Sequence, residues 1–294
     1  MWIRSAQKNN TRTPTEESSM AVTMRALRRV SVLRQVSGKI CSTSPFTSKC
    51  AAPAALGIGA RNFSASPGML EWRSYKIKFS GMEEFMKLTE GSADLRKALH
   101  PKWKGFFTCD TGGCLTTVHH MYHYSDMVER KEVRDKASLD DNWKAYRKAI
   151  GPYVQDQVSS IFKPAVACME AAGSAMIQDF HPEPEDEVMY EMRRYQLHPG
   201  YDNVPRLLDS FAKGLPHKVA ADSNSKLVFF GYIDVGMLNT VIEVWRYPSL
   251  AASIRARESA RKVTEWKKCI GAVTPLVQHF QTQALFPANF SPLH

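Results

Sequence analysis

One segment of the sequence occurs twice, and this duplication constrains the fold more than any other feature. The run from Gly236 to Tyr247 joins a glycine turn to β-branched and aromatic residues, and it matches the run from Gly113 to Tyr124, 123 positions earlier (236 − 113). Each run has the pattern of a buried strand. At the same spacing the identical pairs are Leu115/Leu238, Thr117/Thr240, Val118/Val241, Tyr124/Tyr247, Phe106/Phe229, Phe107/Phe230, Arg134/Arg257, Trp143/Trp266 and Pro152/Pro275. Agreement over roughly fifty residues without a gap indicates two copies of one folding unit.

Each copy predicts the element order βαββαβ, which is the ferredoxin-like unit. In the first copy the patterns predict strands over residues 70–79, 103–109, 114–124 and 158–162, a helix over 81–99 interrupted near Gly91, and a helix to residue 150 with Ser125 as its N-cap. In the second copy they predict strands over 190–197, 227–233, 237–245 and 277–286, with helices over 204–215 and 250–270.

The helices of such a unit cover one face of its sheet and leave the other face bare. In the strand over 237–245 neither face is plainly polar, and we expect Val241, Trp245 and Tyr247 to lie on the bare face. Such a face would be an apolar patch of several hundred Å², and burying apolar surface gains about 25 cal/mol of free energy per Å². We therefore expect the sister copy to cover it. The predicted fold class is therefore α+β, with two tandem ferredoxin-like units forming an architecture of the dimeric α+β barrel type.

The charge of the chain is concentrated in its first 63 residues. The formal net charge is +10, and residues 1–63 hold ten Lys and Arg against two Glu, so the rest of the chain is close to neutral. A near-neutral body gives no reason to expect nucleic acid as a partner. Apolar residues beside a basic face over 20–39 are typical of an organellar transit peptide, and a disordered basic tail is the alternative. Arg61 precedes a candidate mitochondrial cleavage site, with a mature start near Ser64.

These patterns predict the following organisation: a mitochondrial transit peptide over 1–63, a first domain over 69–166, a linker over 167–187, and a second domain over 188–290. The acidic, proline-broken stretch over 182–187 supports the linker. The apolar stretch over 51–60 is too short to span a bilayer, so we expect no transmembrane segment.

Motifs for metal or nucleophilic chemistry are weak. His119 and His123 would lie about 13 Å apart along one strand face, and His120 would point the other way, so we expect no metal site. The cysteines follow no disulfide or zinc spacing and are expected to be buried or free thiols in a reducing compartment. No phosphate loop, nucleophile elbow or dinucleotide fingerprint is found. We therefore expect no catalytic set and no cofactor.

A recurrent Glu-x-Arg-x-Tyr pattern marks the first strand of both copies. Charges on an inner sheet face must be paired or hydrogen-bonded. One interpretation is a polar ligand pocket inside the barrel, and the other is an ion-paired network that fixes strand register. The candidate residues are Glu71, Arg73, Tyr75, Glu191, Arg193, Tyr195, Asn239 and Glu243.

The Glu-x-Arg-x-Tyr strands, the run Gly-Met-Leu-Asn-Thr-Val-Ile-Glu-Val-Trp-Arg-Tyr and the helix from Trp266 to Pro275 resemble the NipSnap family, in particular the branch of the third vertebrate paralogue. The resemblance covers roughly residues 69–290. The first copy departs from the pattern, since His120 and His123 stand in place of Glu243 and Arg246. The resemblance implies a dimeric α+β barrel, mitochondrial residence and no established enzymatic activity.

The leading hypothesis is a non-enzymatic mitochondrial adaptor in quality control (mitophagy signalling) or vesicle-related trafficking. Its expected partners are proteins, autophagy receptors among them, and other NipSnap-type chains in homo- or hetero-oligomers, with peripheral membrane association. The expected location is the mitochondrial matrix, with a further cytosolic or outer-surface pool. The alternative is a small-molecule-binding protein or a monooxygenase-like enzyme that uses a polar pocket inside the barrel.

Overall fold

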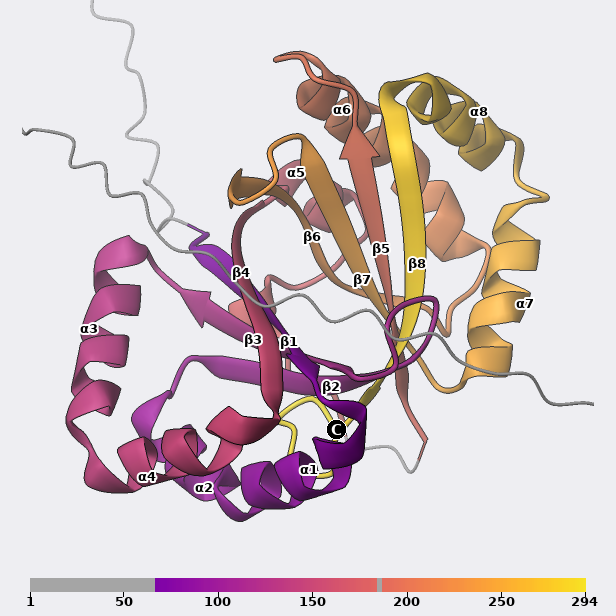
Figure 1. The fold of residues 1–294 in the computed structure, drawn as a ribbon. Helices are drawn as coiled ribbons and strands as arrows, with labels where there is room; N and C mark the ends of the chain where they lie inside the picture. Colours follow the sequence, from indigo (N-terminus) through magenta and orange to yellow (C-terminus); the bar gives the residue numbers. More distant parts are fainter. Residues whose placement is uncertain (1–66, 184–186) are drawn as a thin grey trace, which may run out of the picture. The chain divides into compact units, whose positions relative to one another are not determined.

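The computed structural model describes residues 67–183 and 187–294, so the predicted leader over 1–63 lies outside the described residues. Within them, eight strands form one closed barrel in the order β1-β3-β2-β8-β5-β7-β6-β4 (Figure 1). The strands are β1 (Met69–Ile77), β2 (Trp103–Thr111), β3 (Thr117–Tyr124), β4 (Val154–Pro164), β5 (Met189–Leu197), β6 (Lys226–Val235), β7 (Thr240–Tyr247) and β8 (Val277–Pro287).

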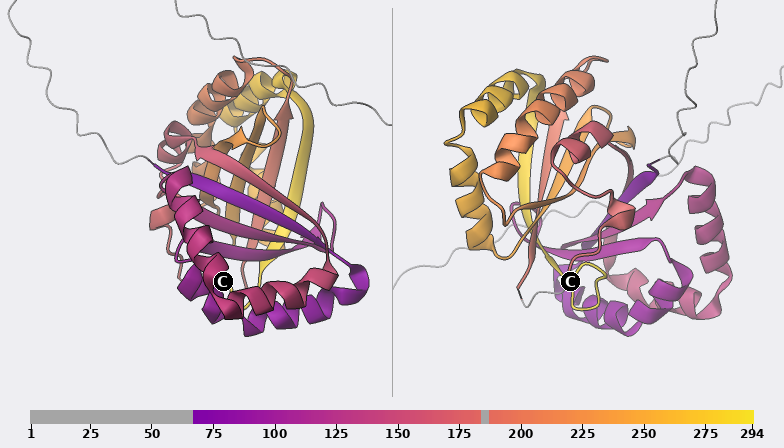
Figure 2. Two further views of the ribbon diagram at one scale, coloured as in Figure 1. Left: turned by 60° about the vertical axis from the view of Figure 1, so that its left-hand side comes forward. Right: turned by 180° about the vertical axis from the view of Figure 1, so that it is seen from behind.

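Each half of the barrel is a four-stranded antiparallel sheet with helices on its outer face. Strand β1 pairs with β3 and β4, and β3 pairs with β2; in the second half β5, β7, β8 and β6 repeat this arrangement. Helices α1 (Met82–Gly91), α2 (Ala93–Leu99), α3 (Met127–Leu139) and α4 (Asp141–Ile150) cover the first sheet, and α6 (Asn203–Ala220), α7 (Leu250–Ala260) and α8 (Thr264–Val273) cover the second (Figure 2). A short helix, α5 (Val166–Ala171), follows β4. The predicted α+β class with two tandem ferredoxin-like units is confirmed.

The two halves join through their outer strands. Strand β2 pairs with β8, where Cys109 lies opposite Leu285, and β4 pairs with β6, where Phe162 lies opposite Ile233. An unpaired outer strand would present a row of free backbone N–H and C=O groups, and closure of the barrel removes it. The duplication therefore lets one chain satisfy the backbone of both sheets.

The barrel interior holds an apolar core that both halves build. The Trp72 and Phe107 rings stack with centroids 6.1 Å apart, and the Phe107 ring meets Tyr190 of the second half at 4.9 Å. Met192, Val228, Phe229, Ile242, Val244 and Leu285 belong to the same cluster. Each sheet also has a separate core against its own helices.

The prediction of which β7 face meets the sister half is wrong. Val241, Trp245 and Tyr247 belong to the core between the second sheet and its helices, whereas Ile242 and Val244 face the barrel interior. Both faces of β7 carry large apolar side chains, so the alternation in sequence separates two faces without showing which one points inwards.

The structure also differs from the predicted helices. The helices expected over 125–150 and 250–270 are each broken into two, α3 and α4 in the first half and α7 and α8 in the second. Asp140 causes the first break, because its carboxylate accepts a hydrogen bond from the backbone N–H of Trp143 at 2.8 Å and caps α4. The N-cap of α3 is Asp126 and not Ser125, since its carboxylate accepts from two backbone N–H groups. The interruption expected near Gly91 is confirmed by the boundary between α1 and α2.

Candidate ligand pocket

The first-strand motif of the first copy forms a buried ion cluster between the sheet and α3. Glu71 is fully buried, and its Oε1 atom accepts hydrogen bonds from Arg73 Nε at 2.9 Å, Arg130 at 2.6 Å and Ser159 Oγ at 2.6 Å. Arg134 lies 3.6 Å from the same oxygen. Burial by itself would raise the pKa of Glu71, but the bond from Arg130, the charge of Arg73 and the bond from Ser159 outweigh it and hold the pKa at about 2.

The second copy builds a larger cluster around two carboxylates. Glu191 pairs with Arg193 and lies 3.7 Å from Arg257 Nε of α7. Glu243 of β7 is fully buried, and it accepts hydrogen bonds from Lys218 Nζ at 3.4 Å and from the ring nitrogen of Trp245 at 2.6 Å.

Lys218 and Glu243 stabilise each other's charged forms. Burial lowers the pKa of Lys218 to about 8, and the nearby Glu243 charge limits that fall. Burial would raise the pKa of Glu243, but the charges of Lys218 and Arg193 bring it below its ordinary value. Tyr195 also donates its hydroxyl to Glu243. The pair is therefore ionised at neutral pH.

The predicted location of these residues inside the barrel is wrong. Arg130 of α3 contacts Glu71, and Lys218 of α6 contacts Glu243, so both clusters lie between a sheet and its helices, outside the barrel wall. The two copies of the motif consequently do not meet. Asn239 lies in the turn between β6 and β7 with a φ of 59°, and its side chain donates to the carbonyl of His198 at 3.4 Å, away from the clusters.

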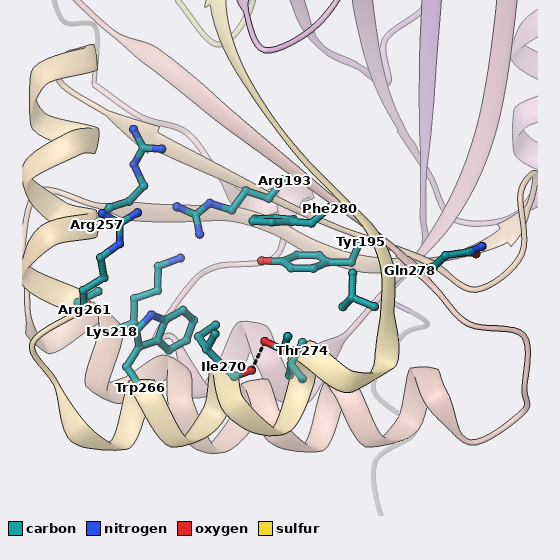
Figure 3. A pocket seen from close by; sticks show the side chains of 13 residues that line it. Arg193, Tyr195, Lys218, Arg257, Arg261, Trp266, Ile270, Thr274, Gln278 and Phe280 are labelled. Carbon is teal, nitrogen blue, oxygen red and sulfur yellow. Dashed lines mark hydrogen bonds between the residues drawn. The ribbon is translucent and has the colours of Figure 1, made fainter.

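A pocket of about 450 Å³ opens beside the cluster of the second copy (Figure 3). Of the predicted residues it includes Arg193 and Tyr195. The sequence does not predict the remaining lining residues as site residues. They come from α6, α7, α8 and β8 and the segments beside them: Lys218, Arg257, Ala260, Arg261, Trp266, Ile270, Val273, Thr274, Val277, Gln278 and Phe280. For two of them, Arg257 and Trp266, the sequence carries a signal, because each recurs in the first copy as Arg134 and Trp143.

In the first copy a buried arginine lies beside the counterpart of Trp266. Arg96 of α2 donates to the hydroxyls of Tyr122 at 2.7 Å and Tyr146 at 2.8 Å, and its guanidinium lies 5.0 Å from the ring centroid of Trp143, the counterpart of Trp266. The His100 ring packs 4.8 Å from the same tryptophan. The two copies have therefore diverged at one position in the fold.

The three histidines of β3 point into separate surroundings. His119 Nδ1 is within hydrogen-bonding distance of Trp72 Nε1 at 3.1 Å. The His120 ring packs 4.7 Å from Phe106, and His123 bonds to the carbonyl of Pro67 at 3.2 Å. Burial lowers the pKa of His119 to about 3. In residues 67–183 and 187–294 no group of three His, Cys, Asp or Glu side chains could hold a metal ion.

The fold places the chain in a known class, tandem ferredoxin-like α+β barrels. An anthrone oxidase-like protein has a TM-score of 0.50 at 12% identity, covering 76% of this chain and 94% of that one. A monooxygenase candidate from Fusobacterium nucleatum has a TM-score of 0.55 at 11% identity, covering 76% and 94%. At such identities the likeness concerns the fold alone.

The chain belongs to the NIPSNAP family, whose model matches residues 70–169 and 190–292. Human NipSnap homolog 3A is 26% identical over 277 residues, covering 93% of this chain and all of the relative. Mouse NipSnap homolog 3B is 26% identical over 226 residues, covering 76% and 85%. Protein NipSnap of Drosophila melanogaster is 29% identical over 105 residues, covering 35% and 36%. These matches confirm the resemblance found in the sequence.

Proposed function

We propose that the chain is a mitochondrial adaptor protein of the NIPSNAP type, acting in mitochondrial quality control (mitophagy signalling) or in vesicle-related trafficking. The observation that carries this is membership of the family over both halves of the barrel. The composition of residues 1–63 supports import into mitochondria, with the matrix as the main location and a second cytosolic or outer-surface pool.

Proteins are the proposed partners, including autophagy receptors and other NipSnap-type chains in homo- or hetero-oligomers. Membrane association would be peripheral. In the described part of the chain, no helix is both long and apolar enough to cross a bilayer.

An exposed apolar turn offers a surface for protein contacts. Met237 and Leu238, in the turn between β6 and β7, are 70% and 66% exposed, and Val235 beside them is 52% exposed. A cluster of large apolar side chains that are exposed to solvent is typical of a surface that a protein partner buries. The sister copy provides a matched control, because Leu115 in the turn between β2 and β3 is the counterpart of Leu238 and is 61% exposed.

The experiment is proximity labelling by the full chain with a labelling enzyme at its C-terminus, before and after mitochondrial depolarisation. We expect mitochondrial neighbours before depolarisation and autophagy receptors after it. The double variant M237S/L238S should lose partners that L115S keeps. A cytosolic chain with no enriched partners under either condition would refute the adaptor function.

Small-molecule binding is a second candidate function, and the pocket beside β8 favours it. The pocket lies outside the barrel wall, and its volume is within the range of about 300–1,000 Å³ typical of small-molecule sites. A monooxygenase-like activity is placed in this pocket and not inside the barrel, because the candidate residues Arg193 and Tyr195 line it. Thermal-shift screening of the full chain with fractionated metabolite extracts tests the candidate, and it fails if no fraction stabilises the protein.

A further inference from the structure

The pocket of the second copy has more positive than negative charge. Four cationic side chains line it, namely Arg193, Lys218, Arg257 and Arg261. The carboxylates that face them are Glu191 and Glu243. Two positive charges are therefore left over, and Arg261 has no ion-pair partner among the residues that the structure describes.

Two of the cations are built into the protein interior. Lys218 is only 5% exposed and pairs with Glu243. Arg193 is only 8% exposed, pairs with Glu191 and lies 3.9 Å from Glu243. Arg257 and Arg261 are on the solvent side, at the end of α7. A partly enclosed group of cations attracts an anion more strongly than the same charges would in open water.

The rest of the pocket is apolar and aromatic. Tyr195 of β5 and Phe280 of β8 stack with ring centroids 4.8 Å apart and an angle of 14° between them. Trp266 and Ile270 of α8 form the opposite wall (Figure 3). Phe280 is 56% exposed, which is unusual for a large aromatic side chain and leaves its ring open to a further stacking partner.

The charges and the apolar walls are separated along the pocket. In Figure 3 the ends of Arg257, Arg261 and Lys218 gather at one side, and Ile270 and Thr274 lie at the other. A ligand that satisfies both regions needs an acidic group at one end and a flat, apolar body at the other. The stacked pair of rings favours a planar body over a flexible chain.

We infer that the second copy binds a planar aromatic carboxylate, with the carboxylate among Arg257 and Arg261 and the ring system between the Tyr195–Phe280 pair and the α8 wall. This inference rests on the small-molecule-binding function proposed above and adds the chemical class of the ligand. The residues that line the pocket all belong to the second half, and in the first half the buried cation Arg96 donates to tyrosine hydroxyls instead.

Three probes of the full chain test the ligand class by isothermal titration calorimetry. They are 2-naphthoate, the neutral 2-naphthamide and the flexible acid decanoate. We expect 2-naphthoate to bind at least about tenfold more tightly than the amide, because it gains a charge-assisted hydrogen bond. Added salt should weaken binding of 2-naphthoate and leave the amide unchanged.

Variants locate the site. Arg261→Gln should weaken 2-naphthoate binding by about tenfold. Arg255→Gln, a change of the same charge at another exposed position of α7 that does not line the pocket, should leave it unchanged. Ile270→Trp should abolish binding of both naphthalene probes by filling the pocket, and the melting temperature of each unliganded variant reports whether it is folded.

Each outcome separates the ligand class from the binding function. If the amide binds as tightly as the acid, the anionic class is wrong and small-molecule binding survives. If decanoate binds more tightly than 2-naphthoate, the planar class is wrong. If none of the probes and none of the extract fractions bind, both the inference and the second candidate function fail. Unchanged 2-naphthoate binding by folded Ile270→Trp would place the site elsewhere.

Discussion

Glu71 provides a quantitative test of the ion clusters outside the barrel. The change is Glu71→Gln, which keeps the size of the side chain and removes its charge. Three arginines lie within 4 Å of this carboxylate, which is fully buried, so the variant leaves their positive charges without a counterion. The cost of breaking a buried ion cluster falls mainly on the partners that remain.

The magnitude follows from the pKa of Glu71, which is about 2 in the folded protein against an ordinary value of 4.5. At about 1.4 kcal/mol for each pKa unit, the ionised carboxylate contributes about 3 kcal/mol to the free energy of unfolding. Because the folded pKa is the lower one, this contribution is complete above pH 4.5. It decreases as the pH falls from 4.5 to 2, where the unfolded chain binds the proton before the folded one does.

The assay is urea denaturation of the wild type and the variant at pH 7, 5, 4 and 3. We expect a difference in the free energy of unfolding of about 3 kcal/mol at pH 7, falling to about 1 to 1.5 kcal/mol at pH 3. Glu132→Gln removes a carboxylate from an exposed position on α3, and it should change stability by less than about 0.5 kcal/mol at every pH. A Glu71→Gln difference that stays constant from pH 7 to pH 3 would show that packing, and not charge, explains the loss.

Two further predictions concern glycines and thiols. An added Cβ at Gly112, whose φ is +82°, would lie 2.0 Å from the backbone oxygen of Thr282, so Gly112→Ala should destabilise the protein by about 1–3 kcal/mol in chemical denaturation. Gly271 of α8 has no atom within 4 Å of such a Cβ, and Gly271→Ala should stabilise by up to about 1 kcal/mol; a loss of equal size in both variants would contradict the close approach at position 112. Among the four described cysteines, Cys114 is exposed, and a hydrogen bond from Thr116 lowers the pKa of its thiol, while burial raises the pKa of Cys168 to about 12. Iodoacetamide should therefore modify Cys114 well before Cys168 in the folded chain, as peptide mapping by mass spectrometry would show, and equal rates would mean that the helix layer opens readily.

The candidate site was only partly accessible from sequence. The repeated Glu-x-Arg-x-Tyr pattern identified Arg193 and Tyr195, because a charge that recurs on a strand of both copies needs a partner. Lys218 and Phe280 carry no local signal of a site: each lies in an element whose pattern is explained by packing or exposure. They line one pocket because α6 and β8 pack beside β5 in the folded chain.

The sequence by itself determined that the protein consists of two ferredoxin-like units, since the spacing of 123 residues repeats both the strands and the turns that join them. It also determined that both sheet faces must be covered, because neither face of β7 is polar. Only the tertiary structure decided which face meets the helices, and this placed the ion clusters outside the barrel wall. The physical reason is that a strand alternates between its two faces with the same period whichever face points inwards. Trp245 packs against the helices and Val244 faces the barrel interior, but the local sequence pattern would be the same if the two were reversed.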